Sequence, residues 1–263
     1  ELPYLKRSFT LKDVVSLFSL YRLIKKEKYD IVHCHSSKAG FLGRLTAWLA
    51  GVRQIYFTAH GWGFYNKAEF GFLRPLLVIG ERISASISTK IICVSNKVKE
   101  DALKERICTE DKLCVIYNGI RLPSSIKKGK LRNEIQATES NFLFGMVGRL
   151  AYQKNPILFL QAARHLLKDM AGIKFVLVGG GPLYPECEEF VKSNNLVGSV
   201  FLLGEREDSV ELIYDFDVFV LTSDFEGLPL VILEALLLGI PVIASKVGGC
   251  EELIEDGQNG FLI

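Results

Sequence analysis

Asp217-Val-Phe-Val-Leu-Thr-Ser-Asp-Phe-Glu-Gly-Leu-Pro-Leu-Val-Ile-Leu-Glu234 decides the fold of the second half of the chain. Its apolar opening predicts a buried β-strand. Pro229 suits the first turn of a following helix, where its missing N–H costs nothing. The helix is expected over about 230–238, because Gly239 then ends it. A strand that leads through a short turn into a helix predicts a βα unit of a parallel sheet.

Two carboxylates flank this turn, with Glu226 in the loop and Glu234 on the second turn of the helix. The free amides near Leu230 and Val231 point toward whatever occupies the turn, and such a helix start holds a phosphate well. One carboxylate on each side of an anion site suits a ligand with hydroxyls at both ends of a diphosphate, such as a nucleotide-sugar. The alternative is that both glutamates are solvated charges at a helix start.

A second unit of the same kind lies upstream, where the apolar strand over 142–147 ends in Gly148-Arg149 and Lys154 follows. Two cations at the carboxyl end of a strand can neutralise a diphosphate without a metal. The alternative is an ordinary surface loop. The next strand runs into Gly179-Gly-Gly181, where backbone can approach a ligand closely, although a glycine run also makes an ordinary strand–helix turn.

Short motifs follow one another along nearly the whole chain. They are His33-Cys-His-Ser-Ser-Lys-Ala-Gly40, Thr58-Ala-His-Gly61, Cys93-Val-Ser-Asn96, Ile116-Tyr-Asn-Gly119, Val147-Gly-Arg-Leu150 with Lys154-Asn155, Val178-Gly-Gly-Gly-Pro182, Glu226-Gly-Leu-Pro229 with Glu234, Val247-Gly-Gly249 with Glu252, and Asn259-Gly-Phe-Leu262. As an ordered set they resemble the family 4 retaining glycosyltransferases of the two-Rossmann glycosyltransferase B (GT-B) fold. The likeness is greatest to members that build bacterial surface polysaccharides.

The resemblance implies an α/β fold with two Rossmann-like domains whose parallel sheets face a cleft. An acceptor-side domain is expected over 1–120, a connection with one short helix over 121–140, and a nucleotide-sugar-binding domain over 141–263. Family members have elements before residue 1 and after residue 263. Both domains are therefore expected to be incomplete, and the chain is expected to be a fragment with little or no activity of its own.

The alternation of apolar and polar segments predicts the elements of both halves. Strands are expected near 29–33, 54–58, 90–94, 113–116, 142–147, 174–178, 199–203, 217–221 and 241–244, and helices near 10–27, 38–50, 72–88, 96–105, 157–168 and 230–238. The first of these helices is amphipathic with basic ends. It is expected to pack on its own sheet, and the alternative is that its rim touches anionic lipid.

Roles for single residues come from the resemblance. It implies that His60 contacts the transferred sugar, that Glu226 holds sugar hydroxyls, and that Glu234 holds the ribose hydroxyls. The loop around Glu205-Arg206 would give backbone contacts to the base. The expected catalytic residues are His60, Arg149, Lys154 and Glu226, and the expected substrate-binding residues are Glu234, Leu230, Val231, Gly181, Arg206 and Gly227.

No metal and no cofactor are expected. His33 and His35 could suggest a metal pair at the end of a strand, but no third ligand follows at a recognisable spacing. The departing diphosphate would instead be stabilised by Arg149, Lys154 and the helix amides. No side chain stands out as a covalent nucleophile, and the family retains anomeric configuration.

The expected function is transfer of a hexose or N-acetylhexosamine from a nucleotide diphosphate-sugar, with UDP favoured, to a saccharide or lipid-linked acceptor in polysaccharide biosynthesis. A GT-B nucleotide-sugar epimerase and a non-catalytic nucleotide-sugar-binding fragment are the alternatives. The formal net charge of +2 argues against a dedicated nucleic-acid binder.

Two features of the sequence bear on where in the cell the protein is expected: its six scattered cysteines and the lack of a long apolar run. The cysteines lack metal-ligand spacing and are interpreted as reduced core residues. A cytoplasmic protein is therefore expected, with peripheral contact to the inner face of the membrane as an option.

Overall fold

The computed structural model describes residues 13–66 and 71–263. The chain divides into two compact units, Glu1–Asn118 and Gly119–Ile263. Each unit contains one parallel β-sheet, of four strands in the first and six in the second. The α/β fold predicted from the sequence is thereby confirmed. The stretch 121–140, expected as a connection, groups with the second unit.

The first unit is built on a sheet in the order β1-β2-β3-β4, with every neighbouring pair parallel. Its strands are β1 (Ile31–His35), β2 (Gln54–Ala59), β3 (Lys90–Cys93) and β4 (Leu113–Val115). Its helices are α1 (Asp13–Glu27), α2 (Ser37–Leu49), α4 (Arg74–Ser86) and α5 (Asn96–Lys104), with 3-10 turns η1 (Gly63–Tyr65), η2 (Gly71–Leu73) and η3 (Glu110–Lys112). Strands and helices alternate, as the periodicity predicts.

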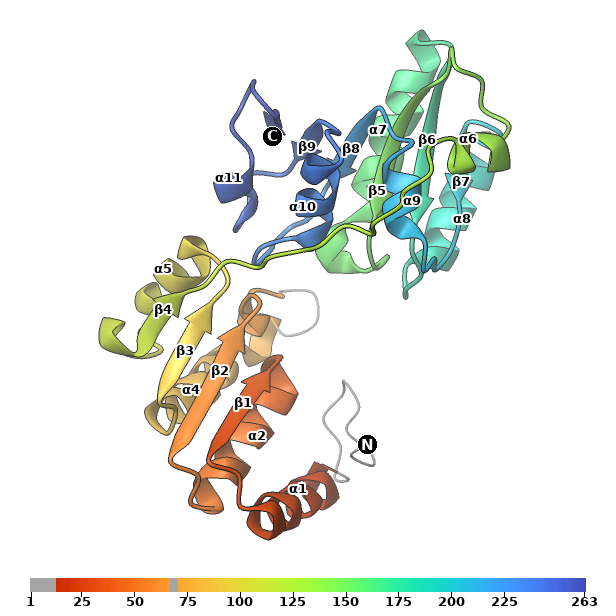
Figure 1. Cartoon of the computed structure of the whole chain (residues 1–263). Coiled ribbons are helices and arrows are strands. Elements are labelled where there is room, and N and C mark those ends of the chain that lie inside the picture. The colour runs from red at the N-terminus through yellow and green to blue at the C-terminus, as the bar shows by residue number, and fades with distance from the viewer. Residues whose placement is uncertain (1–12, 67–70) are drawn as a thin grey trace. The chain divides into compact units, whose positions relative to one another are not determined.

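The two faces of this sheet differ. Ile55, Phe57 and Ile91 are buried on the face that the helices cover. His33 and His35 alternate with buried Cys34, so they lie on the opposite face, where both are exposed. Figure 1 shows the strands of this unit in front of its helices, so the face that the helices leave open is the one toward the viewer.

Strand β1 begins and ends two residues later than the sequence predicts, at Ile31 and His35 instead of 29 and 33. Lys28 has a positive φ of 52°, so the chain turns there before it can extend. In consequence His33 lies within the strand, where it pairs in register with Tyr56 of β2. The predicted helix over 10–27 is present as α1 from Asp13, and its first three positions lie outside the described residues.

The second unit has a six-stranded parallel sheet in the order β10-β9-β8-β5-β6-β7. Its strands are β5 (Phe142–Val147), β6 (Ile173–Val178), β7 (Val200–Leu202), β8 (Val218–Leu221), β9 (Val242–Ala244) and β10 (Gly260–Leu262). Its helices are α6 (Lys130–Glu134), α7 (Pro156–Asp169), α8 (Tyr184–Ser193), α9 (Ser209–Ile213), α10 (Leu230–Leu237) and α11 (Cys250–Leu253), with the 3-10 turn η4 (Tyr152–Lys154). The predicted βα alternation is again confirmed.

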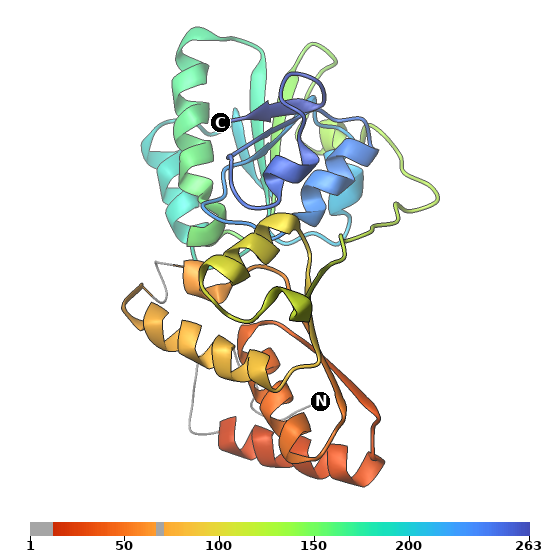
Figure 2. The same ribbon diagram turned by 90° about the vertical axis from the view of Figure 1, so that its left-hand side faces the viewer.

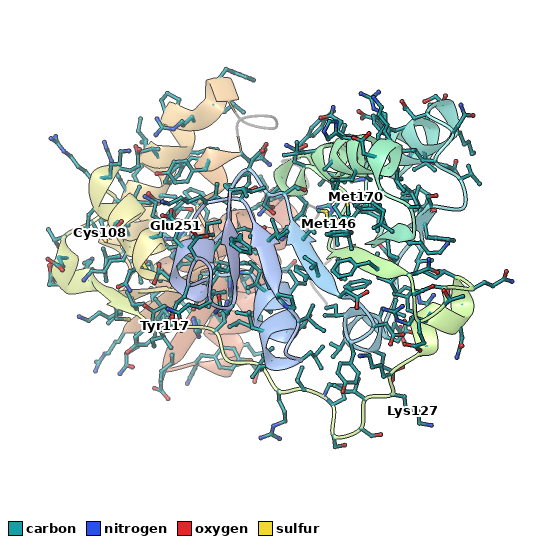
Figure 3. All side chains as sticks on the ribbon, turned by 90° about the horizontal axis from the view of Figure 1, so that it is seen from above. Cys108, Tyr117, Lys127, Met146, Met170 and Glu251 are labelled. Atoms are coloured by element: carbon teal, nitrogen blue, oxygen red, sulfur yellow. The ribbon has the colours of Figure 1, made fainter. Side chains whose placement is uncertain are left out.

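Two apolar layers cover this sheet. Met146 packs with Phe159 of α7 and Cys187 of α8 on one face. Leu143 packs with Leu212 of α9 and Ile232 of α10 on the other. Figure 1 shows α7 and α8 on one side of the strands and α9 and α10 on the other, and Figure 3 shows Met146 beneath α7. The sheet is therefore doubly wound.

A buried carboxylate ties the stretch before β5 to the second unit. Asp215 is almost fully buried and accepts hydrogen bonds from the amides of Gly129 at 2.5 Å and Leu131 at 2.7 Å. Arg132 adds an ion pair of 2.8 Å to Asp217. These contacts satisfy the free amides at the start of α6, which explains why this stretch groups with the second unit.

All six cysteines are free thiols, and four of them are buried. The structure thus agrees with their interpretation as reduced residues of the interior. No helix within the described residues is both long and apolar enough to cross a bilayer.

Candidate functional site

The carboxyl ends of β5 and β8 define a topological switch point in the second unit. These strands are parallel neighbours in the middle of the sheet. From β5 the chain passes through α7 on one face, and from β8 it passes through α10 on the other. In open α/β sheets ligands bind outside the strand ends at such a point, because the two loops diverge there. The residues that the sequence singled out follow these two strands.

A lysine–glutamate pair stands at the centre of the switch point. Lys154 of η4 contacts Glu226 of the β8–α10 loop, with Nζ 2.5 Å from Oε1. The Ser223 hydroxyl donates to the same carboxylate oxygen at 2.6 Å. Both charged side chains are largely withdrawn from solvent, at 16% and 6% exposed. Two of the four predicted catalytic residues are therefore in direct contact, although 72 positions separate them in sequence.

Hydrogen bonds join the two loops on either side of this pair. The Asp224 amide donates to the Gln153 carbonyl at 2.8 Å, and the Gln153 side chain returns a bond of 3.1 Å to the Phe225 carbonyl. The Thr222 hydroxyl donates to the Asn155 carbonyl at 2.9 Å. This brace holds the backbone on which Lys154 and Glu226 stand, which is how a site is preorganised.

The start of α10 supplies donors to the same region. Pro229 is the N-cap residue, and the amides of Leu230 and Val231 donate to no atom of the described residues. Unsatisfied amides at a helix start favour an anion. The prediction that these two amides bind phosphate remains a prediction that this geometry permits.

Glu234 lies one turn further along α10 and is half-buried. Burial raises the pKa of this carboxyl, and no neighbouring cation opposes the shift. Glu234 also forms no ion pair with a described residue. A half-buried acceptor without a protein donor is suited to hydroxyl groups of a ligand.

Arg149 directly follows β5 and its adjacent glycine, and its side chain is exposed. It forms no ion pair with any residue that the structure describes. Gly148 lies between the strand and this arginine, and an added Cβ there would meet the Lys154 side chain at 3.5 Å. Arg149 and Lys154 thus emerge from the same loop, as the sequence predicts, but only Lys154 is fixed by a partner.

Two predicted substrate-binding residues have structural roles of their own. Gly181 has a φ of +148°, and an added Cβ would lie 2.4 Å from the Leu150 carbonyl oxygen, so packing alone requires a glycine there. The Arg206 guanidinium binds Asp208 at 2.8 Å and Glu134 at 2.7 Å. Its side chain is therefore engaged within the protein, and only its backbone could serve a base as predicted.

Gly227, in the loop that carries Glu226, is held by a contact with Gly249. It is buried, and its carbonyl accepts a hydrogen bond of 3.0 Å from the Gly249 amide. An added Cβ on Gly249 would lie 2.2 Å from that same oxygen. The Val247-Gly-Gly249 motif therefore packs against the loop that carries Glu226 and supports it.

His60 lies in the first unit, immediately after β2, and belongs to a group of three histidines. His60 Nε2 is 3.0 Å from His35 Nδ1, and the two rings stack with centroids 5.3 Å apart. His33 Nε2 is 2.8 Å from the Thr58 hydroxyl. Burial, followed by the repulsion of neighbouring histidines, lowers the pKa of both His33 and His60. These rings are therefore biased toward the neutral form, in which an imidazole can both donate and accept.

Sequence reasoning missed several residues that shape the site. They are Gln153, Thr222, Ser223 and Gly248. Gln153, Thr222 and Gly248 act through contacts between segments that are distant in sequence, so spacing along the chain gave no signal for their roles. Ser223 contacts Glu226 within the same loop, and a serine in a loop has no distinctive sequence signal. The glycines of the 247–249 motif were noted as a pattern, but not as a support for Glu226.

Comparison with protein families assigns both halves of the chain. Residues 127–263 match the model "Glycosyl transferases group 1", and residues 1–122 match "Glycosyltransferase Family 4". Two family models of sugar transferases thus account for nearly the whole chain. The chain belongs to the family 4 glycosyltransferases, as its motifs predict.

Two curated relatives are similar to this chain over almost its whole length. The chain is 41% identical over 269 residues to the Escherichia coli UDP-Gal:alpha-D-GlcNAc-diphosphoundecaprenol alpha-1,3-galactosyltransferase, which covers 99% of this chain and 69% of the relative. It is 30% identical to the E. coli O-antigen biosynthesis glycosyltransferase WbnH over 100% of this chain and 70% of that protein. The predicted enzyme class, glycosyltransferase, is confirmed.

Solved structures agree on the fold. Anabaena HepE in complex with UDP and glucose superimposes with a TM-score of 0.79 at 25% identity, over 98% of this chain and 70% of HepE. Sucrose-phosphate synthase from Thermosynechococcus elongatus gives a TM-score of 0.81 at 21% identity, over 100% of this chain and 68% of that protein. The predicted GT-B architecture is therefore confirmed.

Proposed function

We propose that this glycosyltransferase moves a hexose from a UDP-sugar to a lipid-linked saccharide during the synthesis of a bacterial surface polysaccharide. The observation that carries the proposal is the Lys154–Glu226 pair at the switch point, beside the open amides of α10. It is supported by the relative named as a UDP-Gal transferase acting on a diphosphoundecaprenol acceptor, and by HepE, which binds UDP and glucose.

The arrangement suits a diphosphate-sugar. Phosphate oxygens would bind Arg149, Lys154 and the amides of Leu230 and Val231, while hydroxyls of the transferred sugar would bind Glu226. As the sugar–phosphate bond breaks, negative charge grows on the departing diphosphate. Fixed donors stabilise that charge without having to reorganise, which lowers the barrier. We infer that no metal and no cofactor are needed beyond the donor itself.

Glu234 would bind the ribose hydroxyls, one turn along α10 from the phosphate site. His60, held by its hydrogen bond to His35, would contact the transferred sugar. No observation favours the epimerase or the non-catalytic alternative over sugar transfer. The acceptor would be lipid-linked, so peripheral contact with a membrane on the cytoplasmic side is part of the proposal.

Nucleotide preference tests the donor assignment. Calorimetric titration with UDP, GDP and ADP is expected to show the tightest binding for UDP. Variant Glu226→Gln should then retain nucleotide binding and lose sugar transfer, because its proposed contacts are with the sugar. Tighter binding of GDP or ADP would overturn the donor assignment.

Glu234→Gln is expected to weaken UDP binding by about tenfold or more, since a charged hydrogen-bond acceptor is lost. The same variant should unfold at a higher temperature near neutral pH. Burial raises the pKa of Glu234, so the folded protein holds its carboxylate at a cost once the pH exceeds that pKa. A neutral glutamine avoids this cost.

The thermal gain should shrink as the pH falls through the raised pKa, because wild type then becomes protonated. Thermal melts across this pH range check the sign, and titration of UDP checks the affinity. Glu188→Gln, on the exposed side of α8, is the matched control and should change neither. Loss of stability near neutral pH in Glu234→Gln would contradict the assignment of an unpaired, ligand-facing carboxylate.

A further inference from the structure

Helix α4 of the first unit carries an exposed apolar stripe. Phe72 in the 3-10 turn that leads into the helix is 86% exposed, and Leu76, Ile79 and Ile83 are 64%, 49% and 55% exposed. These positions are spaced by four, three and four residues, so they share one face of the helix. Surface helices ordinarily present polar side chains to solvent. The stripe is defined here as Phe72, Leu76, Ile79 and Ile83.

The other side of α4 already supplies the contact with the fold. Val78, Ser84 and Ala85 are buried there, and a Cβ added at Gly80 would lie 3.7 Å from the Phe41 ring of α2. The stripe is therefore not the face that packs on the sheet. Figure 2 shows α4 at the front of its unit, with no described element of that unit covering its outer side.

The nearest carboxylates on α4 and at the end of α5 are paired with cations. Glu81, on α4 itself, forms an ion pair of 2.7 Å with the buried Arg44. Glu105, at the end of α5, forms one of 2.6 Å with Arg74. Neither acid therefore opposes the approach of a negatively charged surface.

Basic side chains also lie beside the stripe. Arg82 lies between Ile79 and Ile83, is exposed, and donates to the Glu105 carbonyl oxygen at 2.7 Å. This contact brings the end of α5 beside α4, where Lys104 and Arg106 are exposed. An apolar stripe with a basic margin matches the interface of an anionic bilayer, where acyl chains accept the apolar groups and headgroups attract the cations.

The direction of α4 relates the stripe to the histidines. Strand β2 ends at Ala59, directly before His60, and α4 runs back along the sheet from that end. The Phe72 end of the stripe is consequently the end nearest the carboxyl ends of the strands. A bilayer beneath the stripe would lie next to the part of the unit that is proposed to meet the acceptor.

We propose that the stripe on α4 is the surface by which this protein lies on an anionic lipid bilayer. The inference rests on the proposed function in one respect, the reason for membrane binding. Binding would bring a lipid-linked acceptor to the His60 end of the sheet. The helix has 13 residues, so it lies in the interface and does not span the membrane. The other amphipathic helix of the unit, α1, exposes Val14 and Phe18 and serves as the comparison.

The test is binding to vesicles of phosphatidylcholine and phosphatidylglycerol, followed by co-sedimentation. Leu76→Ser/Ile79→Ser is expected to weaken binding by at least about tenfold, because two exposed side chains no longer enter the interface. Arg82→Gln should weaken it less, and added salt should weaken binding of wild type. Met170→Ser/Val197→Ser, which removes two exposed apolar side chains from the second unit, is the matched control and should bind as wild type.

Circular dichroism confirms that each variant is folded, and Ile83→Gln is a second variant should the double one misfold. Unchanged binding in folded stripe variants overturns the proposal. Loss of vesicle binding in Phe18→Ser of α1, but not in the stripe variants, also overturns it. A third contrary result is a stripe that joins two copies of the chain and binds no vesicles. Stripe variants should keep UDP affinity and transfer to a water-soluble acceptor. A protein that binds vesicles but not UDP would contradict the proposed function and would still support the membrane-binding surface.

Discussion

Replacement of Lys154 by alanine is expected to lower kcat of sugar transfer by about 10²–10³-fold, the usual effect of removing one fixed donor from a developing negative charge. Lys154 Nζ lies 2.5 Å from Glu226, so its position is set before any phosphate arrives. Its charge interacts most strongly with the diphosphate as it departs. The loss should therefore fall more on kcat than on KM for the donor.

Steady-state kinetics with the UDP-sugar, together with UDP titration, separates these effects. Lys192→Ala, which removes an exposed lysine from α8, is the matched control and should leave kcat unchanged. Because Lys154→Ala leaves Glu226 without its cation, Lys154→Arg and a thermal melt show whether lost activity follows lost charge or lost fold. A kcat within about threefold of wild type in a folded Lys154→Ala variant would remove this residue from the mechanism.

The same donors make transfer independent of divalent metal in our proposal. A chelator is expected to leave the rate of wild type nearly unchanged, while Arg149→Ala lowers it in the same direction as Lys154→Ala. Arg149 is exposed and forms no ion pair with a described residue, so the effect of its loss should be the smaller of the two. Activity that disappears in EDTA and returns with Mg²⁺ or Mn²⁺ would contradict the roles proposed for Arg149 and Lys154.

Much of the fold could be predicted because local signals agree with the tertiary structure. The helix after Pro229 begins and ends within a residue of the prediction, since proline and Gly239 mark its limits chemically. The β1 boundary was wrong by two residues because a positive φ at Lys28 delays the strand, and nothing in the residue type announces it. Strand β10 (Gly260–Leu262) was not predicted, because its few apolar residues follow a run of turn-forming residues, Asp256-Gly-Gln-Asn-Gly260.

The site was predicted only as far as motifs reach. Lys154 and Glu226 could each be singled out, because both follow an apolar strand that ends in polar residues. Their contact could not, because it depends on β5 and β8 being neighbours in the sheet, and strand order is a property of the whole unit. The same reason hides Gln153, whose partner Phe225 lies across the switch point.

Gly248→Ala is expected to lower kcat/KM for sugar transfer by about 100-fold, because a displacement of roughly 1 Å in a catalytic group can cost that much. Gly248 has a φ of +54°, and an added Cβ would lie 1.9 Å from the Glu226 carbonyl oxygen. The neighbour is backbone, so no side chain can rotate to make room. The loop that carries Glu226 must shift, and its contact with Lys154 must change.

Gly257→Ala separates this effect from backbone strain. Gly257 also has a positive φ, of +78°, but an added Cβ there meets nothing within 4 Å. Both variants pay the strain of a left-handed alanine, about 1 kcal/mol of stability, and only Gly248→Ala also displaces Glu226. Kinetics and thermal melts of the two variants should therefore show similar small losses of stability from strain, a further loss in Gly248→Ala, and a loss of activity in Gly248→Ala alone. Equal activity in the two would mean that the 247–249 motif does not position the Glu226 loop, and that the glycines are there for the turn itself.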